Sequence, residues 1–237
     1  MAWSTSKAAM RSWCWPLASL ALSASAAAQP ALPARVEIEY ELKRNGSVMA
    51  EVVDRLEQAN GSYQLSEHWK GKGIYAVMGK AKRTSAGMLT ADGPRPTEYV
   101  DERSGRDTQR VSFDWKANTV TRRYKGDTRT EGVPLHTQDR LSFLLALTFA
   151  SSKSGPVSFH IADGRGMSRH TYQVSGRERV ATPAGEFDAI KVTRDSEGSS
   201  EVAELWFAAD RGHLPVRIVL VEKDGTRYEH LARRIEP

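Results

Sequence analysis

The sequence predicts a mainly β protein: a curved antiparallel sheet of about a dozen strands forming a barrel or half-barrel, with one packed helix. Two observations predict this fold class. Apolar and charged residues alternate with a period of two over much of the chain after Val36, which places them on opposite faces of a sheet. Turn signals containing glycine separate the alternating runs. A flat sheet of so many strands would leave an apolar face and two edges bare, so we expect it to curl.

The first 28 residues have the features of a secretory signal peptide in their usual order. Lys7 and Arg11 give a positive start, a short apolar run follows, and small residues lead up to Ala28. Cleavage is predicted after Ala28, with a cut after Ala26 as the alternative.

Cys14 is the only cysteine and lies inside this leader. The remaining residues, 29–237, would therefore hold no disulfide and no cysteine ligand for a metal. Their length suits a single β-rich domain. No apolar stretch after the leader reaches the roughly 20 residues that span a bilayer. We therefore expect a periplasmic protein with no transmembrane segment after cleavage.

The first half of the domain is predicted to be an up-and-down meander. Val36, Ile38, Tyr40 and Leu42 alternate with charged residues, and Asn45-Gly46 then indicates a hairpin turn because both turn positions need a positive φ. Asn60-Gly61 indicates the next turn. Further strands are expected over 48–56, 63–69, 81–90, 97–102, 110–115 and 119–124. The segment 71–80 interrupts the alternation with three glycines and is predicted to be a short helical turn or a flap.

One helix is predicted, over about 138–151. Leu141, Leu145 and Phe149 recur at helical spacing, and Thr137 or Asp139 can accept a backbone N–H bond at its start. A helix this apolar should be buried against an open side of the sheet.

The last third of the chain is predicted to be strands again. The expected strands cover 157–161, 168–175, 177–181, 187–194, 201–207, 214–222 and 227–235. Pro215 lacks a backbone donor, which indicates an edge strand or an outward-facing position.

We find no motif that predicts a catalytic, metal or cofactor site. The six histidines lack the close spacing of zinc ligands, and no Gly-x-Ser-x-Gly occurs. Gly71 to Ala76 matches a dinucleotide-binding pattern, but it lies among antiparallel strands rather than in a βαβ unit. Acidic and basic residues are interspersed, with a net charge of +5, so we expect no nucleic-acid partner.

Large apolar and aromatic side chains are the candidate ligand-binding residues. A curved sheet covered by a helix or flap can hold a ligand in its mouth. The alternative is that these side chains form core or rim, as most tryptophans at strand ends do. The candidates are Trp69, Tyr75, Met78, Trp115, Trp206, Leu214 and Ile218.

Several segments resemble a bacterial family of exported proteins, domain of unknown function 3108. They are Asp139-x-Leu141-Ser142, the run Thr182 to Val192, Trp206-Phe207, and Leu214 to Ile218. The resemblance spans roughly 36–235 and implies export and a β-rich domain, with no activity and no catalytic residues to carry over. The Trp-containing strand and Leu-Pro-Val-x-Ile are also similar to hairpins of periplasmic lipoprotein carriers. Those are half-barrels in which several helices, rather than one, cover an apolar cavity.

Three functions are consistent with these features. The favoured one is a non-catalytic exported protein that binds or carries a lipid or other apolar ligand, and it predicts a cavity under the 138–151 helix or the 71–80 flap. The second is a cell-envelope scaffold or assembly factor that binds another protein through a sheet edge or surface patch. The third is a hydrolase with dispersed catalytic residues.

Overall fold

The structure is a computed structural model that describes residues 1, 32–151, 155–195 and 200–237. The predicted leader, 1–28, and its cleavage point lie outside these described residues apart from Met1.

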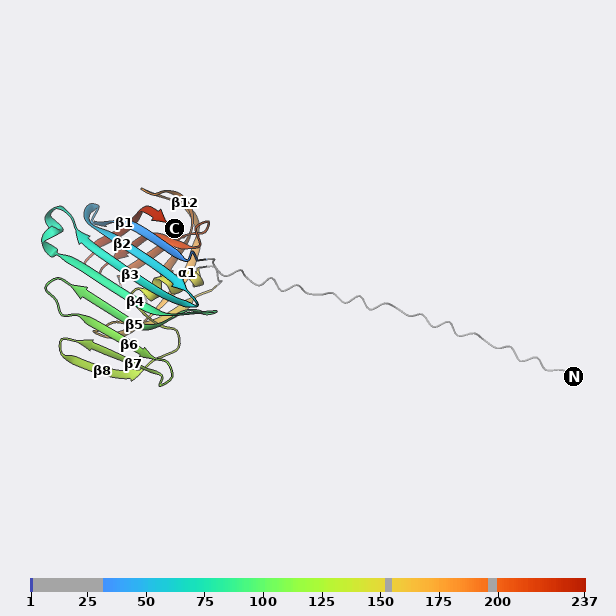
Figure 1. Ribbon diagram of the computed structural model, residues 1–237. Coiled ribbons are helices and arrows are strands. Elements are labelled where there is room, and N and C mark those ends of the chain that lie inside the picture. Colours follow the sequence, from blue (N-terminus) through green and yellow to red (C-terminus); the bar gives the residue numbers. More distant parts are fainter. Residues whose placement is uncertain (2–31, 152–154, 196–199) are drawn as a thin grey trace.

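The strands form one fifteen-stranded sheet with the order β8-β7-β6-β5-β4-β3-β2-β1-β15-β14-β13-β12-β11-β10-β9. Figure 1 shows β1 to β8 side by side in chain order. All neighbours are antiparallel except β9 and β10, which are parallel. The strands are β1 (Arg35–Arg44), β2 (Ser47–Ala59), β3 (Ser62–Gly71), β4 (Lys80–Thr90), β5 (Gly93–Arg103), β6 (Gln109–Asp114), β7 (Thr119–Tyr124), β8 (Asp127–Gly132), β9 (Thr137–Asp139), β10 (Val157–Ala162), β11 (Met167–Thr182), β12 (Gly185–Arg194), β13 (Val202–Ala208), β14 (Leu214–Val221) and β15 (Arg227–Glu236). The meander is therefore confirmed, and pairing between β1 and β15 joins its two halves.

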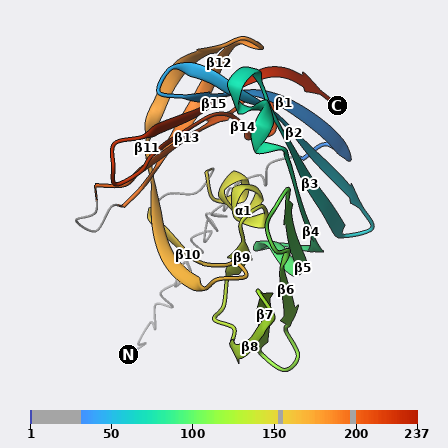
Figure 2. The same cartoon turned by 90° about the vertical axis from the view of Figure 1, so that its left-hand side faces the viewer.

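The sheet curves around the helix α1 (Ser142–Ala150), as Figure 2 shows, and it is not closed into a barrel. The predicted fold class is confirmed in its half-barrel form. A second, 3-10 helix, η1 (Gly73–Met78), connects β3 to β4 at one end of the half-barrel (Figures 1 and 2). It occupies the segment predicted to be a helical turn or flap.

Turn chemistry accounts for the first hairpins. Asn45 and Gly46 have φ values of 48° and 83°, and Asn60 and Gly61 have 51° and 73°. These left-handed conformations suit the right-handed twist of the flanking strands, and asparagine and glycine adopt them at low cost.

Three sequence predictions differ from the structure. β8 and β9 were not predicted, because β8 is polar throughout and β9 has only three residues. Two expected strands on either side of residue 176 are one bulged strand, β11. Of the two alternatives predicted for Pro215, an edge strand or an outward-facing position, the edge strand is wrong, since β14 lies between β13 and β15. No donor is needed at that position, because pairing with β15 begins at Arg217 and the register with β13 shifts beside it.

The concave face carries the core. Along β1, Val36, Ile38, Tyr40 and Leu42 are buried, while the residues between them are at least partly exposed. α1 contributes to the apolar clusters on this face through Leu145 and Leu147. The helix is short, so it covers only part of the trough formed by the sheet.

Candidate functional site

A cavity of about 340 Å³ occupies the end of the concave face next to η1. Its apolar residues are Leu42, Met49, Val52, Trp69, Ala81, Leu220 and Tyr228. Its ionisable residues are Glu67, Lys80, Arg83, Arg103, Arg106 and His230, and Ser104 completes the lining. The space is therefore amphipathic, and more cationic than anionic.

Strand register brings the apolar wall together. Val52 on β2 pairs with Trp69 on β3, and Trp69 pairs with Ala81 on β4. On the other side, Leu220 on β14 pairs with Tyr228 on β15. Directly paired residues point to the same face, so a period of two on each strand is enough to build this wall.

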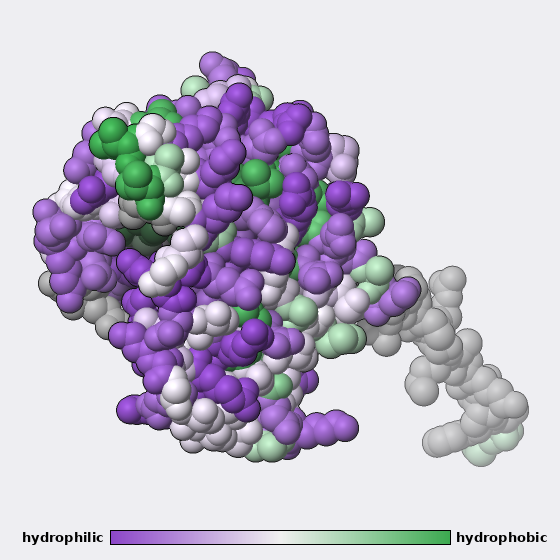
Figure 3. Space-filling model, turned by 60° about the vertical axis from the view of Figure 1, so that its left-hand side comes forward, coloured by the Kyte–Doolittle hydropathy of each residue, from purple (hydrophilic) through white to green (hydrophobic). Residues whose placement is uncertain are grey.

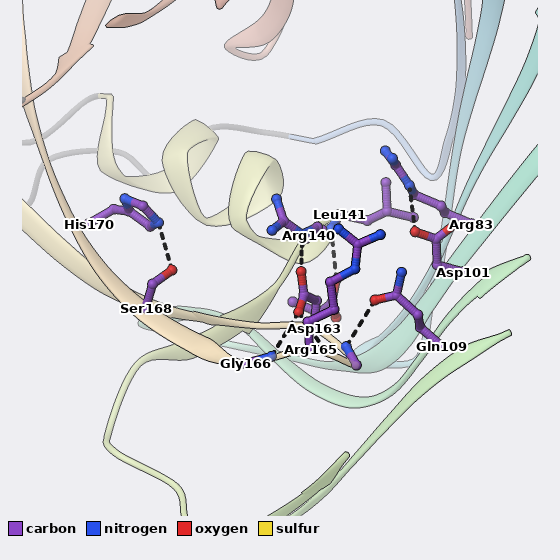
Figure 4. Close-up of polar contacts among 12 residues, drawn as sticks. Arg83, Asp101, Gln109, Arg140, Leu141, Asp163, Arg165, Gly166, Ser168 and His170 are labelled. Carbon is purple, nitrogen blue, oxygen red and sulfur yellow. Dashed lines mark hydrogen bonds and ion pairs between the residues drawn. The ribbon is translucent and has the colours of Figure 1, made fainter. Parts of the chain in front are cut away.

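A row of charged side chains crosses four strands at the base of this wall. Asp54 on β2 pairs with Glu67 on β3, Glu67 with Arg83 on β4, and Arg83 with Asp101 on β5. Arg83 donates a 2.8 Å hydrogen bond to Glu67 and lies 3.4 Å from the Asp101 carboxylate. Arg103 donates to both oxygens of Asp101. We call Asp54, Glu67, Arg83 and Asp101 the polar row; Figure 4 shows its Arg83–Asp101 contact.

Protonation within the polar row follows from burial and charge. Burial first, and then the neighbouring Glu67 carboxylate, raise the pKa of Asp54 well above its ordinary value, although Arg83 opposes them. Burial alone would raise the pKa of Asp101, but the hydrogen bonds and charges of Arg103 and Arg83 lower it. The row therefore contains one carboxyl whose protonated form is favoured, Asp54, and one whose ionised form is favoured, Asp101.

His230 faces the same cavity from β15. Burial, with the nearby Arg83 charge, lowers the pKa of His230 to about 4. Its ring meets the Tyr40 ring edge-on, with centroids 6.0 Å apart. Within the described residues, His230 Nδ1 and Asp54 Oδ1 are buried atoms with no hydrogen-bond partner. His230 lines this cavity, so a bound molecule could satisfy its Nδ1 atom, whereas Asp54 is not part of the cavity lining.

A second cavity lies beside α1, the other of the two places at which the sequence predicts one. It measures about 60 Å³ and is lined by mostly apolar residues of α1, β1 to β3 and β14, including Leu56, Leu145 and Leu214. This space is well below the roughly 300–1,000 Å³ of typical ligand sites. Of these two spaces, the cavity beside η1 is the larger.

The start of α1 is fixed by polar contacts rather than by a ligand. The Asp139 carboxylate accepts 2.8 Å bonds from the backbone N–H groups of Leu141 and Ser142, and a 2.6 Å bond from the Ser85 hydroxyl. The predicted capping role of Asp139 is thus confirmed, although the helix begins at Ser142 rather than near 138. Burial raises the pKa of Asp139 against the opposing effect of these hydrogen bonds.

A polar network continues from α1 to the loop after β10 (Figure 4). Arg140 donates to Asp163 at 2.6 Å, and Asp163 accepts from the backbone of Arg165 and Gly166. Gln109 on β6 accepts from the backbone N–H of Gly164. These polar groups bond to one another, and the bonds hold the loop against the rest of the concave face.

The seven predicted ligand-binding residues fall in different places. Trp69 lines the cavity beside η1. Tyr75 lies on η1 and packs against the main core. Met78 is the last residue of η1, and its side chain lies outside the described part. Leu214 lines the smaller cavity.

The other three candidates lie away from both cavities. Trp115 follows β6, stacks on Phe113 and donates to the Pro96 carbonyl. Trp206 is a buried residue of the main core and donates to Glu178. Ile218 belongs to the cluster that packs against α1. Residues such as Leu220, Tyr228 and Arg83 line the cavity instead. Leu220 had a sequence signal, because it is the next inward position after Ile218 on β14.

The described residues contain two serine–histidine contacts. Ser151 lies 2.7 Å from His213 Nδ1, but it is buried and also donates to the Thr148 carbonyl. Ser168 and His170 meet at 2.9 Å on an exposed part of β11 (Figure 4). Among the described residues, His213 has no ion pair with a carboxylate that would orient it as a catalytic base. The same residues contain no group of three metal-ligating side chains.

Among the described residues, no helix has the length and apolar character needed to cross a membrane.

Comparison with known proteins gives a family match. The family model described as "Protein of unknown function (DUF3108)" matches residues 37–231. No curated protein matches the chain. One similar solved structure is a putative exported protein with a YmcC-like fold from Bacteroides fragilis, with 11% identity, a TM-score of 0.39, and coverage of 85% of this chain and 95% of that one. Another is a putative lipoprotein from Parabacteroides distasonis, with 11% identity, a TM-score of 0.34, and coverage of 88% and 99%.

Proposed function

This chain belongs to the DUF3108 family of proteins of unknown function, and we propose from its site that it is an exported protein that binds an amphipathic, lipid-like molecule with an acidic headgroup. The binding site is the cavity beside η1. The observation that carries the proposal is the division of this cavity into an apolar wall and a cationic rim.

The dimensions of the cavity suit a small ligand. Its volume of about 340 Å³ lies within the roughly 300–1,000 Å³ of typical ligand sites. Leu42, Val52, Trp69 and Leu220 supply apolar surface for part of a hydrocarbon chain. Such sites combine a mainly apolar lining with a few polar groups that fix orientation.

The cationic side chains at the rim are the reason for proposing a negatively charged headgroup. Arg83 and Arg103 are already paired with carboxylates of the polar row. Lys80 and Arg106 are exposed, and among the described residues neither has an ion-pair partner. A carboxylate or phosphate at the rim would pair with these two charges, whereas a neutral headgroup would not.

Binding can be tested with palmitate, using displacement of a fluorescent fatty acid. Leu220 is 39% exposed and faces the cavity, so Leu220→Arg places a charged side chain where the chain of the ligand would lie. We expect this change to weaken binding at least about tenfold. Val202→Arg is the matched control, because Val202 is 40% exposed and lies on the adjacent strand outside the cavity lining. Absence of palmitate binding, or equal binding by both variants, would refute the proposal.

The headgroup is tested separately. Arg106→Glu should weaken binding of palmitate while leaving binding of its methyl ester nearly unchanged, because only the acid carries a charge. Equal effects on both ligands would remove the acidic headgroup from the proposal. Native mass spectrometry of the protein recovered from its own cells would identify any lipid that co-purifies.

Binding of an envelope protein at a sheet edge is the second candidate function. It is favoured by β8, a strand at one edge of the sheet whose residues are all exposed. However, β8 carries Asp127, Arg129 and Glu131, and charges of this kind discourage pairing with another strand. Hydrogen exchange in the presence of envelope extract tests this candidate, which requires new protection of the β8 amides.

A further inference from the structure

Helix η1 presents two large apolar side chains to solvent. Ile74 is 81% exposed and Val77 is 92% exposed. They are three residues apart, and a 3-10 helix has three residues per turn, so both lie on one side of η1. In Figure 3, hydrophobic residues gather at the upper left, where η1 lies in Figure 1, and the surface is hollowed directly below.

This apolar surface is held in place by the backbone. The N–H of Lys72 donates to the Met49 carbonyl on β2 at 2.8 Å. At the other end, the backbone of Lys80 is bonded in both directions to the Ser104 hydroxyl, at 3.0 and 3.1 Å. Tyr75 is partly buried against the main core and anchors the inner side of the helix. Ile74 and Val77 are therefore displayed on a braced turn.

Lysines surround the same turn. Residues 70–82 contain Lys70, Lys72, Lys80 and Lys82 and no acidic residue. Lys72 pairs with Glu51. The other three are exposed, and no ion pair holds any of them within the described chain. We call residues 70–82 the docking tip.

We propose that the docking tip binds the surface of a membrane that contains anionic lipids. Ile74 and Val77 would enter the boundary between headgroups and acyl chains, while the lysines contact the headgroups. Exposed apolar side chains flanked by basic residues are the combination that binds such interfaces. Charge decides the partner, because each lysine near an anionic surface strengthens binding about fivefold. The inference does not depend on the proposed ligand, although the tip lies at the mouth of the cavity.

The test is co-sedimentation with vesicles, using the protein in the form in which its cells accumulate it. Vesicles of phosphatidylcholine alone are compared with vesicles of phosphatidylcholine and phosphatidylglycerol. We expect binding to the anionic vesicles, weakening as salt is raised. The double variant Ile74→Ser, Val77→Ser should bind them at least about tenfold more weakly. Lys70→Glu with Lys82→Glu should reduce both the affinity and its salt dependence.

Two controls separate this surface from other sites. Leu135 is 78% exposed and lies between β8 and β9, so Leu135→Ser removes a comparable apolar side chain elsewhere and should leave vesicle binding unchanged. Leu220→Ser alters the cavity lining without adding a charge, and should also leave vesicle binding unchanged. Absence of vesicle binding, equal binding by the double variant, or an equal loss with Leu135→Ser would overturn the proposal. If the parent bound no vesicles but captured another protein that the double variant did not capture, the docking tip would instead be assigned to that protein.

Discussion

Replacing His230 with phenylalanine should remove a large pH dependence of stability. The pKa of His230 is about 4 in the folded protein, against about 6.5 for an unperturbed histidine. Well above pH 6.5, the side chain is neutral in both states. As pH falls, the unfolded chain takes up a proton that the folded protein does not, so stability decreases. A difference of roughly 2.5 units at about 1.4 kcal/mol each corresponds to about 3 kcal/mol lost between pH 7 and pH 4.

The assay is urea unfolding of the parent and His230→Phe at pH 7, 6, 5 and 4. Phenylalanine preserves the edge-to-face contact with Tyr40 and has no Nδ1 atom to leave unpaired. We therefore expect similar stabilities at pH 7 and a growing advantage of the variant below pH 6. The titration of carboxyl groups, including Asp54, is common to both proteins and cancels in the difference. Parallel pH profiles, or an imidazole that titrates near 6.5 by NMR in the folded parent, would refute the reasoning.

Three further changes test the supports of the site. Asp139→Ala should lower the free energy of unfolding by about 2–4 kcal/mol, and Asp139→Asn by less, because alanine leaves the backbone donors at the start of α1 unpaired; thermal denaturation measures both. Arg83→Met should cost about 3–5 kcal/mol at pH 7, as urea unfolding would show, because it leaves the Glu67 carboxylate without its ion-pair partner. Gly71→Ala would place a Cβ 2.1 Å from the Tyr75 carbonyl, so it should displace η1 and weaken vesicle binding. Gly132→Ala, which has open space around it, is the control.

The first half of the sheet could be predicted because local and long-range requirements agree. The alternation of Val36, Ile38, Tyr40 and Leu42 requires a strand with one buried face, and Asn45-Gly46 fixes the register of the next strand. Each strand then pairs with its neighbour in sequence. The pairing of β1 with β15 could not be read in this way, since no local signal connects residues so far apart in the chain.

The helix and the sheet edges were predicted less well for physical reasons. Asp139 was proposed as a cap, and it does hold the helix start. The residues just before the helix nevertheless form β9, because Thr137 to Asp139 pair with β10, far along the chain. β8 has no buried face to produce an apolar pattern, and its residues are held by pairing with β7.

The candidate site could be predicted only in part, because large aromatic residues occur in the core as well as in the cavity. Trp69 lines the cavity, but Trp206 is a core residue. A different signal was present: Asp54 and Glu67 stand at positions that the period of two assigns to the apolar face, as Asp101 does on β5. A charge in such a position is either paired or functional. Which of the two applies depends on Arg83, whose place opposite Glu67 follows from register rather than from composition.

The polar row also explains where the cavity ends. One step along the strands toward η1, Val52 and Trp69 form the apolar wall; one step the other way, Leu56 and Leu65 belong to the surface beside α1. The row therefore separates the part of the trough that α1 fills from the part that it leaves open. Because Arg83 is already bound by carboxylates on both sides, the row offers an apolar chain no favourable contact. The hydrocarbon part of a ligand should thus stop at the row, and the distance from the row to the rim sets how much of the chain the protein can cover.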